Sequence, residues 1–210
     1  MQLFHPESKF MSAITLMADI VILNMLFVVS CLPILTVGAA TRAANVVVRD
    51  MVEGVGSGHA MRFLRELANE WKAATAYWLL LAAAIALLAY QQWVVFQAGV
   101  QGIALTIIQA LSISGAFVIA AITVWFYGWA SARSRPAASF VALFNSAVVS
   151  AFAHLSRTVA AVTILGAGVL LILWLPFGWA VPMTFFFIPV MTIYLIRLVV
   201  AGGLGERLGE

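Results

Sequence analysis

Two long stretches without Asp, Glu, Lys or Arg dominate the pattern of polar and apolar positions: Ala73–Ala132 and Thr158–Ile196. A helix needs about 20 apolar residues to cross roughly 30 Å of hydrocarbon. The first stretch therefore predicts two membrane spans near 73–96 and 104–129, joined by the polar break Gln97–Gln101.

The second stretch predicts two shorter spans, near 158–175 and 181–200. Pro176, Gly178 and Pro182 separate them, as is typical of a turn. Pro189 and Pro33 are further positions at which a helix can break.

The region from Phe10 to Thr41 carries only one charged residue, Asp19. About 32 helical residues would reach about 48 Å, which is too long for one upright crossing. The crossing runs either about 11–32, with Asp19 inside the membrane, or about 20–41, with Asp19 at the interface. We expect Pro33 to kink one tilted helix that combines both, which gives five crossings in all.

Composition agrees with this pattern, because 64% of the 210 residues are hydrophobic and only 9% are charged. Globular chains are roughly a quarter charged, so a water-soluble enzyme, a disordered tail and a disulfide scaffold are excluded. The expected fold is all-α: a polytopic helical membrane bundle with about five transmembrane helices plus two cytoplasmic amphipathic helices. Residues 1–210 are expected to form a single transmembrane domain.

The basic residues lie between the spans and predict the orientation by the positive-inside rule. The segments concerned are 42–72, 130–157 and the C-terminal tail, and they contain Arg42, Arg49, Arg62, Arg65, Lys72, Arg133, Arg135, Arg157, Arg197 and Arg207. The turns 97–103 and 176–182 carry no charge. We predict a multi-pass protein of the bacterial plasma membrane, with the N-terminus outside and the C-terminus in the cytoplasm.

Each cytoplasmic segment contains a predicted amphipathic helix. The first covers 60–72, and the second begins at Pro136 and ends at Arg157, with an apolar stripe that includes Phe152. These helices either lie on the lipid headgroups or dock a cytoplasmic partner. The candidate docking residues are on the polar side of the first helix: Arg62, Arg65, Glu66, Asn69 and Glu70.

Asp19 and Asn24 are the candidate functional residues within the membrane. A charge at mid-membrane costs about 2.5–3.5 kcal/mol on insertion scales, so a deep Asp19 would be functional, whereas an interfacial or capping Asp19 would be unremarkable. Asn24 points roughly 140° away from Asp19 on an ideal helix, so the two do not form one site. A buried Asn is expected to bond to a neighbouring helix.

No motif for catalysis is present, and the three histidines lack the spacing of metal ligands. We therefore expect no enzyme activity, no cofactor and no metal, and the scattered basic residues do not predict nucleic-acid binding. The lipid bilayer is the expected partner. A small-solute transporter or channel with Asp19 in its pathway remains the alternative function, and the sequence is compatible with a homo-oligomer.

Two segments resemble signatures of the YesL-like family of small bacterial membrane proteins. The first runs from Ala18 to Phe27 and continues from Cys31 to Thr41, with matches at Asp19, Asn24, Pro33, Thr36 and Gly38. The second runs from Phe63 to Thr75. Beyond these segments the resemblance is one of hydropathy, length and number of spans.

The resemblance implies a domain without assigned function and without established catalytic residues. Members of that family are often encoded near ATP-driven carbohydrate importers and polysaccharide-degrading enzymes. This implies a non-catalytic accessory or regulatory role in carbohydrate uptake, with permease subunits of a sugar importer as the expected partners.

Overall fold

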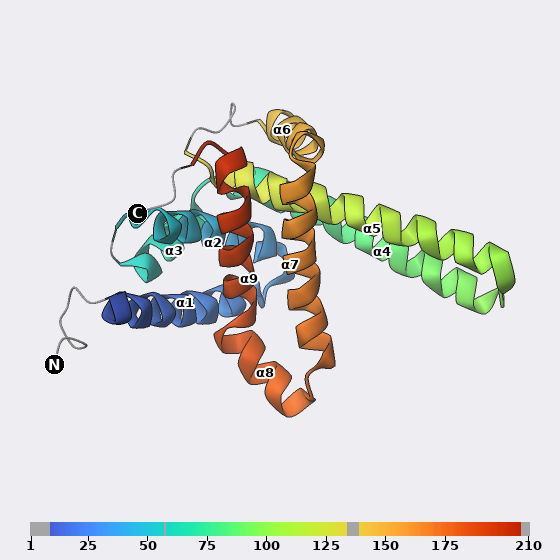
Figure 1. Ribbon diagram of the computed structural model, residues 1–210, viewed down its shortest axis with the longest axis horizontal. Coiled ribbons are helices and arrows are strands. Elements are labelled where there is room, and N and C mark those ends of the chain that lie inside the picture. Colours follow the sequence, from blue (N-terminus) through green and yellow to red (C-terminus); the bar gives the residue numbers. More distant parts are fainter. Residues whose placement is uncertain (1–8, 57, 134–138, 207–210) are drawn as a thin grey trace.

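The computed structural model describes residues 9–56, 58–133 and 139–206, and this part of the chain is helical without a β-strand (Figure 1). The elements are α1 (Lys9–Cys31), η1 (Ile34–Thr36), α2 (Val37–Val52), α3 (His59–Ala68), α4 (Trp71–Gln97), α5 (Gly102–Ser131), α6 (Phe140–Ala153), α7 (Leu155–Trp174), α8 (Phe177–Phe186), α9 (Ile188–Val200) and η2 (Ala201–Gly203). The predicted all-α class is confirmed.

Four of these helices are long and apolar enough to cross a membrane: α1, α4, α5 and α7. The bent pair formed by α8 and α9 makes up to five crossings. Large apolar side chains cover their outer surfaces, and Phe96, Trp174 and Phe177 are more than four-fifths exposed. Apolar surface of this extent is covered by lipid in a membrane protein. The chain is therefore a multi-pass membrane protein.

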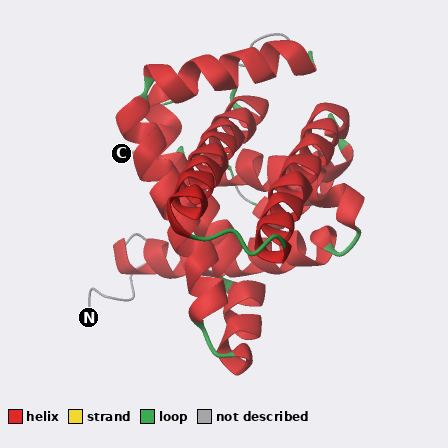
Figure 2. Cartoon of the chain, turned by 90° about the vertical axis from the view of Figure 1, so that its right-hand side faces the viewer, coloured by secondary structure: helices red, strands yellow, loops and turns green. Residues whose placement is uncertain are grey.

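The helical hairpin α4–α5 extends away from the rest of the molecule, and Figure 2 looks onto the loop that joins the two helices. The spans predicted near 73–96 and 104–129 agree with its two helices to within two residues at each end. Their lengths of 27 and 30 residues correspond to about 40 and 45 Å. Side-chain hydrogen bonds join the two helices near the tip, from Gln91 to Ser112 and from Gln109 to Gln92.

The predicted single kinked span near the N-terminus is wrong, because the chain reverses direction at Pro33. Helix α1 ends at Cys31, and α2 then runs back along it (Figure 1). Ile20 of α1 and Val48 of α2 consequently belong to the same buried apolar cluster. Pro33 cannot donate a backbone hydrogen bond, and Thr36 turns its hydroxyl back onto the carbonyl of Ser30. The span predicted as 11–32 corresponds to α1, whereas α2 is a separate helix.

The last span is broken at Phe187 rather than separated from the preceding span by Pro182. Pro182 lies inside α8, and the turn after α7 consists of Leu175 and Pro176. Helices α8 and α9 meet at an angle of 55°. Pro189 occupies the first turn of α9, where a proline needs no backbone partner. The sequence thus indicated Pro189 as a residue at a helix break. The turn after α7, however, lies at residues 175–176 instead of extending to Pro182.

The two short helices differ from their predicted bounds. Helix α3 ends at Ala68 instead of continuing to 72, because Glu70 adopts a left-handed conformation with φ of 48° before α4 begins. Helix α6 begins at Phe140 after Ser139, whose hydroxyl accepts a hydrogen bond from the backbone of Ala142. Pro136 lies outside the described residues, and Phe152 of the predicted apolar stripe is 64% exposed.

Helix α2 lies at the centre of the molecule and is buried over nearly its whole length. On one side it packs against α1, α3 and α9, in a cluster that includes Phe63 and Val190. A second cluster around Trp125 and Phe126 joins α4, α5, α6, α7 and α9. This most buried helix carries three charged residues, Arg42, Arg49 and Asp50.

Gly38 lets α2 approach α4 closely. A Cβ atom placed at Gly38 would lie 2.4 Å from the carbonyl oxygen of Ala74 and 2.8 Å from Cβ of Trp78. Both neighbours belong to α4, and the first is backbone, so neither can move aside without displacing the helix. Small residues at such crossings are typical of membrane helix packing.

Replacement of Gly38 by Val is expected to separate α2 from α4 and to lower the melting temperature in mild detergent by several degrees, as overpacking costs about 1–3 kcal/mol. Gly115→Ala in α5 is the control, because nothing lies within 4 Å of a Cβ at that position. A Gly38→Val protein that melts together with the Gly115→Ala protein would contradict the close approach.

Candidate functional site

Arg42 and Arg49 lie on one face of α2, because residues seven apart in a helix complete nearly two turns. The two side chains are each only 7% exposed. They point towards the C-terminal ends of two other helices, α3 and α5. The last carbonyl groups of a helix have no partner within the helix and carry partial negative charge, so an arginine is well suited to this position.

Arg42 closes the end of α3. Its Nη1 donates to the carbonyl oxygens of Glu66 and Asn69 at 3.2 and 3.0 Å. Its Nη2 donates to Oε2 of Glu66 at 3.0 Å and lies 3.5 Å from Oε2 of Glu70. One buried guanidinium thus fixes the segment at which α3 ends and α4 begins.

Arg49 and Arg197 close the end of α5 in the same way. Arg49 donates from Nη1 to the carbonyl of Ser131. Arg197, which is 1% exposed, donates from Nη1 to Oγ of Ser131 at 2.7 Å and to the carbonyl of Gly128 at 3.2 Å. Ser131 therefore connects α2 and α9 at the end of α5.

Asp50 is the carboxylate around which this group is arranged. It is fully buried, and its oxygens lie 2.8 Å from Nη2 of Arg49, 2.6 Å from Nε of Arg62 and 3.6 Å from Nη2 of Arg133. A buried carboxylate is stable only when it is paired. Asp50 thereby joins α2, α3 and the segment that follows α5.

Further carboxylates balance the remaining positive charge. Glu53 lies 2.8 Å from Nη2 of Arg133, and Glu206 pairs with Arg197. Burial raises the pKa of Glu206, and the charge of Arg197 opposes that shift. We call these ten residues the arginine cluster: Arg42, Arg49, Arg62, Arg133, Arg197, Asp50, Glu53, Glu66, Glu70 and Glu206.

Most of the predicted docking residues take part in this cluster. Arg62 pairs with Asp50, Glu66 and Glu70 lie against Arg42, and the carbonyl of Asn69 accepts from Arg42. Arg65 differs, since it is exposed and forms no hydrogen bond or ion pair with the described residues.

Asp19 belongs to the apolar helix α1, where it lies beside α3. Its Oδ2 is 3.6 Å from Nε2 of His59, the first residue of α3, and its side chain is one-third exposed. The hairpin at Pro33 causes this proximity, because it brings the first half of α1 back to the end of α2.

Asn24 lies in a different environment from Asp19, as the helical angle between them predicts. It is fully buried, and its Nδ2 donates to the carbonyl oxygens of Thr184 and Phe185, each at 2.8 Å. Its Oδ1 accepts from the backbone N–H of Val190 at 2.8 Å. All three backbone groups flank the break between α8 and α9, so one amide side chain satisfies the groups that the break leaves without helical partners.

From the sequence alone, Arg42, Arg49 and Arg197 are expected only to set the orientation, and Asp50 is not a candidate site residue. The spacing of seven between Arg42 and Arg49 was a usable signal, because it places both on one helix face. Arg133, Arg197 and Glu206 offered no such local signal, since their partners are distant in sequence. Arg135 and Arg207 lie outside the described residues.

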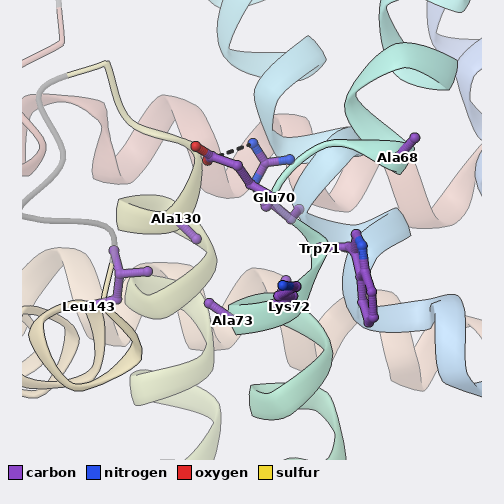
Figure 3. Close-up of a pocket in the computed structure, with 9 residues that line it drawn as sticks. Ala68, Glu70, Trp71, Lys72, Ala73, Ala130 and Leu143 are labelled. Atoms are coloured by element: carbon purple, nitrogen blue, oxygen red, sulfur yellow. Dashed lines mark ion pairs between the residues drawn. The ribbon is translucent and has the colours of Figure 1, made fainter.

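Two adjacent pockets of about 260 Å³ each open at the arginine cluster. One is polar and is lined by Arg42, Arg49, Arg62 and Arg133 together with Glu66. The other lies at the start of α4 and has a more apolar wall (Figure 3). Guanidinium groups stay protonated and are suited to holding anions rather than to transferring protons. Among the described residues, no group of three or more His, Cys, Asp or Glu could hold a metal ion.

The first part of the chain matches a known family. Residues 20–91 match a family described as a protein of unknown function, DUF624. The matching segment runs from the buried part of α1 through most of α4, and it contains Asn24, Gly38, Arg42, Arg49 and Asp50. Residues 92–210 lie outside the match. No curated protein and no solved structure matches the chain.

Replacement of Asn24 by Ala is expected to leave two carbonyls and one N–H without partners at the break between α8 and α9. The expected loss is about 2 kcal/mol or more, measured by unfolding in mixed micelles. Asn45→Ala is the control, because the Asn45 side chain is also buried but, among the described residues, donates only to Thr41 of its own helix. Equal losses for both variants would show that the Asn24 contacts do not hold the break.

Replacement of Asp50 by Asn keeps the shape of the side chain but removes the charge that pairs with three arginines. We expect a loss of about 3–5 kcal/mol, as for other broken buried ion pairs, measured by the same unfolding experiment. Glu53→Gln serves as the control, because Arg133, its partner, is half-exposed, and it is expected to lose about 1 kcal/mol or less. If Asp50→Asn were as mild as Glu53→Gln, Asp50 would not organise the cluster.

Proposed function

We propose that this chain is a non-catalytic subunit of the bacterial plasma membrane that assembles with another membrane protein. Its role is accessory or regulatory in carbohydrate uptake, and its partners are permease subunits of an ATP-driven sugar importer. The sugar-uptake part of the proposal rests on the resemblance to the YesL-like family. The matching family of unknown function leaves that part open to experiment.

The observation that carries the proposal is that α3 leaves large apolar residues exposed although two of its charged residues are turned inward. Arg62 and Glu66 turn towards α2, whereas Met61 and Leu64 are 66% and 47% exposed. A helix at a water-exposed end of a membrane protein normally places its charged residues outward. Outward apolar residues at that position favour coverage by another protein surface.

We call this surface the α3 ridge: Met61, Leu64, Arg65 and Ala68, which all face the same side because they are three or four residues apart. Arg65 gives the ridge a positive charge that the described residues do not neutralise. An amphipathic segment of a permease with an acidic residue in its apolar face would complement it. The bilayer surface is the competing covering for the same ridge.

The positive-inside rule supports a cytoplasmic position of the arginine cluster, the α3 ridge and Glu206. The turns after α4 and α7 carry no charge and lie at the far ends of their helices. The outside N-terminus rested on a single kinked span. Because the chain reverses direction at Pro33, the start of α1 lies on the same side as α3 (Figure 1). The prediction of an N-terminus outside the cell therefore loses its support.

The alternative, a transporter or channel within this chain, has weaker support. Transporters use the backbone groups of broken helices to bind substrates or ions. Here the groups at the break between α8 and α9 bond to Asn24. Asp19 lies beside His59 rather than in a polar pathway through the helices.

The proposal predicts that the tagged chain, purified from native membranes in mild detergent, brings with it permease subunits that mass spectrometry identifies. A Met61→Glu/Leu64→Glu variant is expected to lose at least nine-tenths of the bound permease without a change in melting temperature. Both substitutions place a carboxylate in the apolar contact, and both positions are exposed in the isolated chain.

Val149→Glu in α6 is the matched control, because Val149 is also 66% exposed on a short apolar helix but is remote from the α3 ridge in sequence. It is expected to retain the permease. The proposal fails if the wild-type chain is recovered alone, or if Val149→Glu loses the permease as completely as the double variant does.

A further inference from the structure

The pocket at the start of α4 combines a cationic end with an apolar wall. Arg42, Glu70 and Lys72 contribute the charged groups, and Trp71 and Leu143 contribute apolar surface (Figure 3). The lining residues come from α2, the end of α3 and the segment after it, α4, α5 and α6. The pocket has a volume of about 260 Å³ and opens to the outside of the protein.

Lys72 is the accessible cation of this pocket. Its side chain is exposed and forms no hydrogen bond or ion pair with the described residues. Arg42, by contrast, is buried and holds Glu66 and Glu70. The three charged side chains that line the pocket therefore sum to one net positive charge, and that charge is available at Lys72.

The apolar side of the pocket continues into the surface that faces lipid. Trp71 is 48% exposed, and Leu79, which lies seven residues after Lys72 and so on the same face of α4, is 50% exposed. Trp and Lys side chains at the end of a span are typical of the headgroup level of a bilayer. A molecule that fills the pocket can thus extend directly along the outer face of α4.

We propose that this pocket binds the phosphate group of an anionic phospholipid. Lys72 holds the phosphate, and the acyl chains lie along Trp71 and the outer face of α4. Leu143 closes the side opposite to Trp71 (Figure 3). The apolar continuation favours a lipid over a free phosphate ion, since a free ion would use only the charged end.

The test measures the melting temperature of the purified chain in mild detergent, with phosphatidylglycerol, phosphatidylcholine or inorganic phosphate added. Phosphatidylglycerol is expected to raise the melting temperature of the wild type by several degrees, because a ligand that binds only the folded state stabilises it. The other two additions are expected to have no such effect. Native mass spectrometry counts the bound lipid.

Lys72→Gln is expected to bind phosphatidylglycerol at least ten-fold more weakly. Arg65→Gln is the matched control, because it removes an exposed, unpaired cation on α3 that does not line this pocket, and it is expected to bind like the wild type. Ala68→Trp, which places a bulky side chain at the rim without changing charge, is expected to weaken binding as Lys72→Gln does.

Three results would overturn the proposal. Equal effects of phosphatidylcholine would show that the charge is not recognised, and an effect of inorganic phosphate alone would identify a free-anion site. Equal losses for Lys72→Gln and Arg65→Gln would indicate general attraction to a charged surface. Because the experiment uses the isolated chain, its outcome is independent of any permease and of the proposed function.

Discussion

Where water is scarce, the backbone groups at the ends of helices need hydrogen-bond partners within the protein, and this need governs the structure. Each helix that ends inside the protein leaves carbonyl groups without partners, and an unsatisfied polar group costs several kcal/mol in an apolar environment. Arg42, Arg49 and Arg197 supply the missing donors at the ends of α3 and α5. Their burial in turn requires negative charge, which Glu66 and Glu70 provide for Arg42, Asp50 for Arg49 and Glu206 for Arg197. The position of α2 at the centre, the inward turn of α3 and the meeting of α5 with α9 all follow from this requirement.

The break between α8 and α9 presents the same problem deeper in the apolar part of the molecule, and a different residue solves it. Asn24 carries both donor and acceptor and no charge, so it satisfies two carbonyls and an N–H without needing a counter-ion. A guanidinium in that position would need a carboxylate as well. The division between arginines at the charged end and a neutral amide at the break therefore follows from the cost of burying charge.

The sequence predicted those features that depend on hydropathy alone. Helices α4 and α5 lie where the charge-free stretch placed them, because a long apolar run in a membrane has no alternative to helix. The structure differs where tertiary contacts decide. Pro33 allows a kink or a reversal, and only the packing of Ile20 against α2 selects the reversal. Asn24 was expected to bond to another helix, but Thr184 and Val190 are too distant in sequence to have been identified. From the sequence, the arginines were interpreted as orientation signals, because a count of charges does not show which backbone carbonyls accept hydrogen bonds from them.

The α4–α5 hairpin is held at its base. There α4 and α5 belong to the apolar cluster around Trp125, and Arg49 and Arg197 bind the end of α5. Beyond Leu81, the last residue of α4 that packs against this cluster, α4 continues to Gln97 over about 24 Å, away from the rest of the molecule (Figure 1). A rotation of about 10° at the base would therefore move the tip by about 4 Å. The apolar cluster and the arginines at the base thus set the direction of the outer half of the hairpin, although they lie far from its tip.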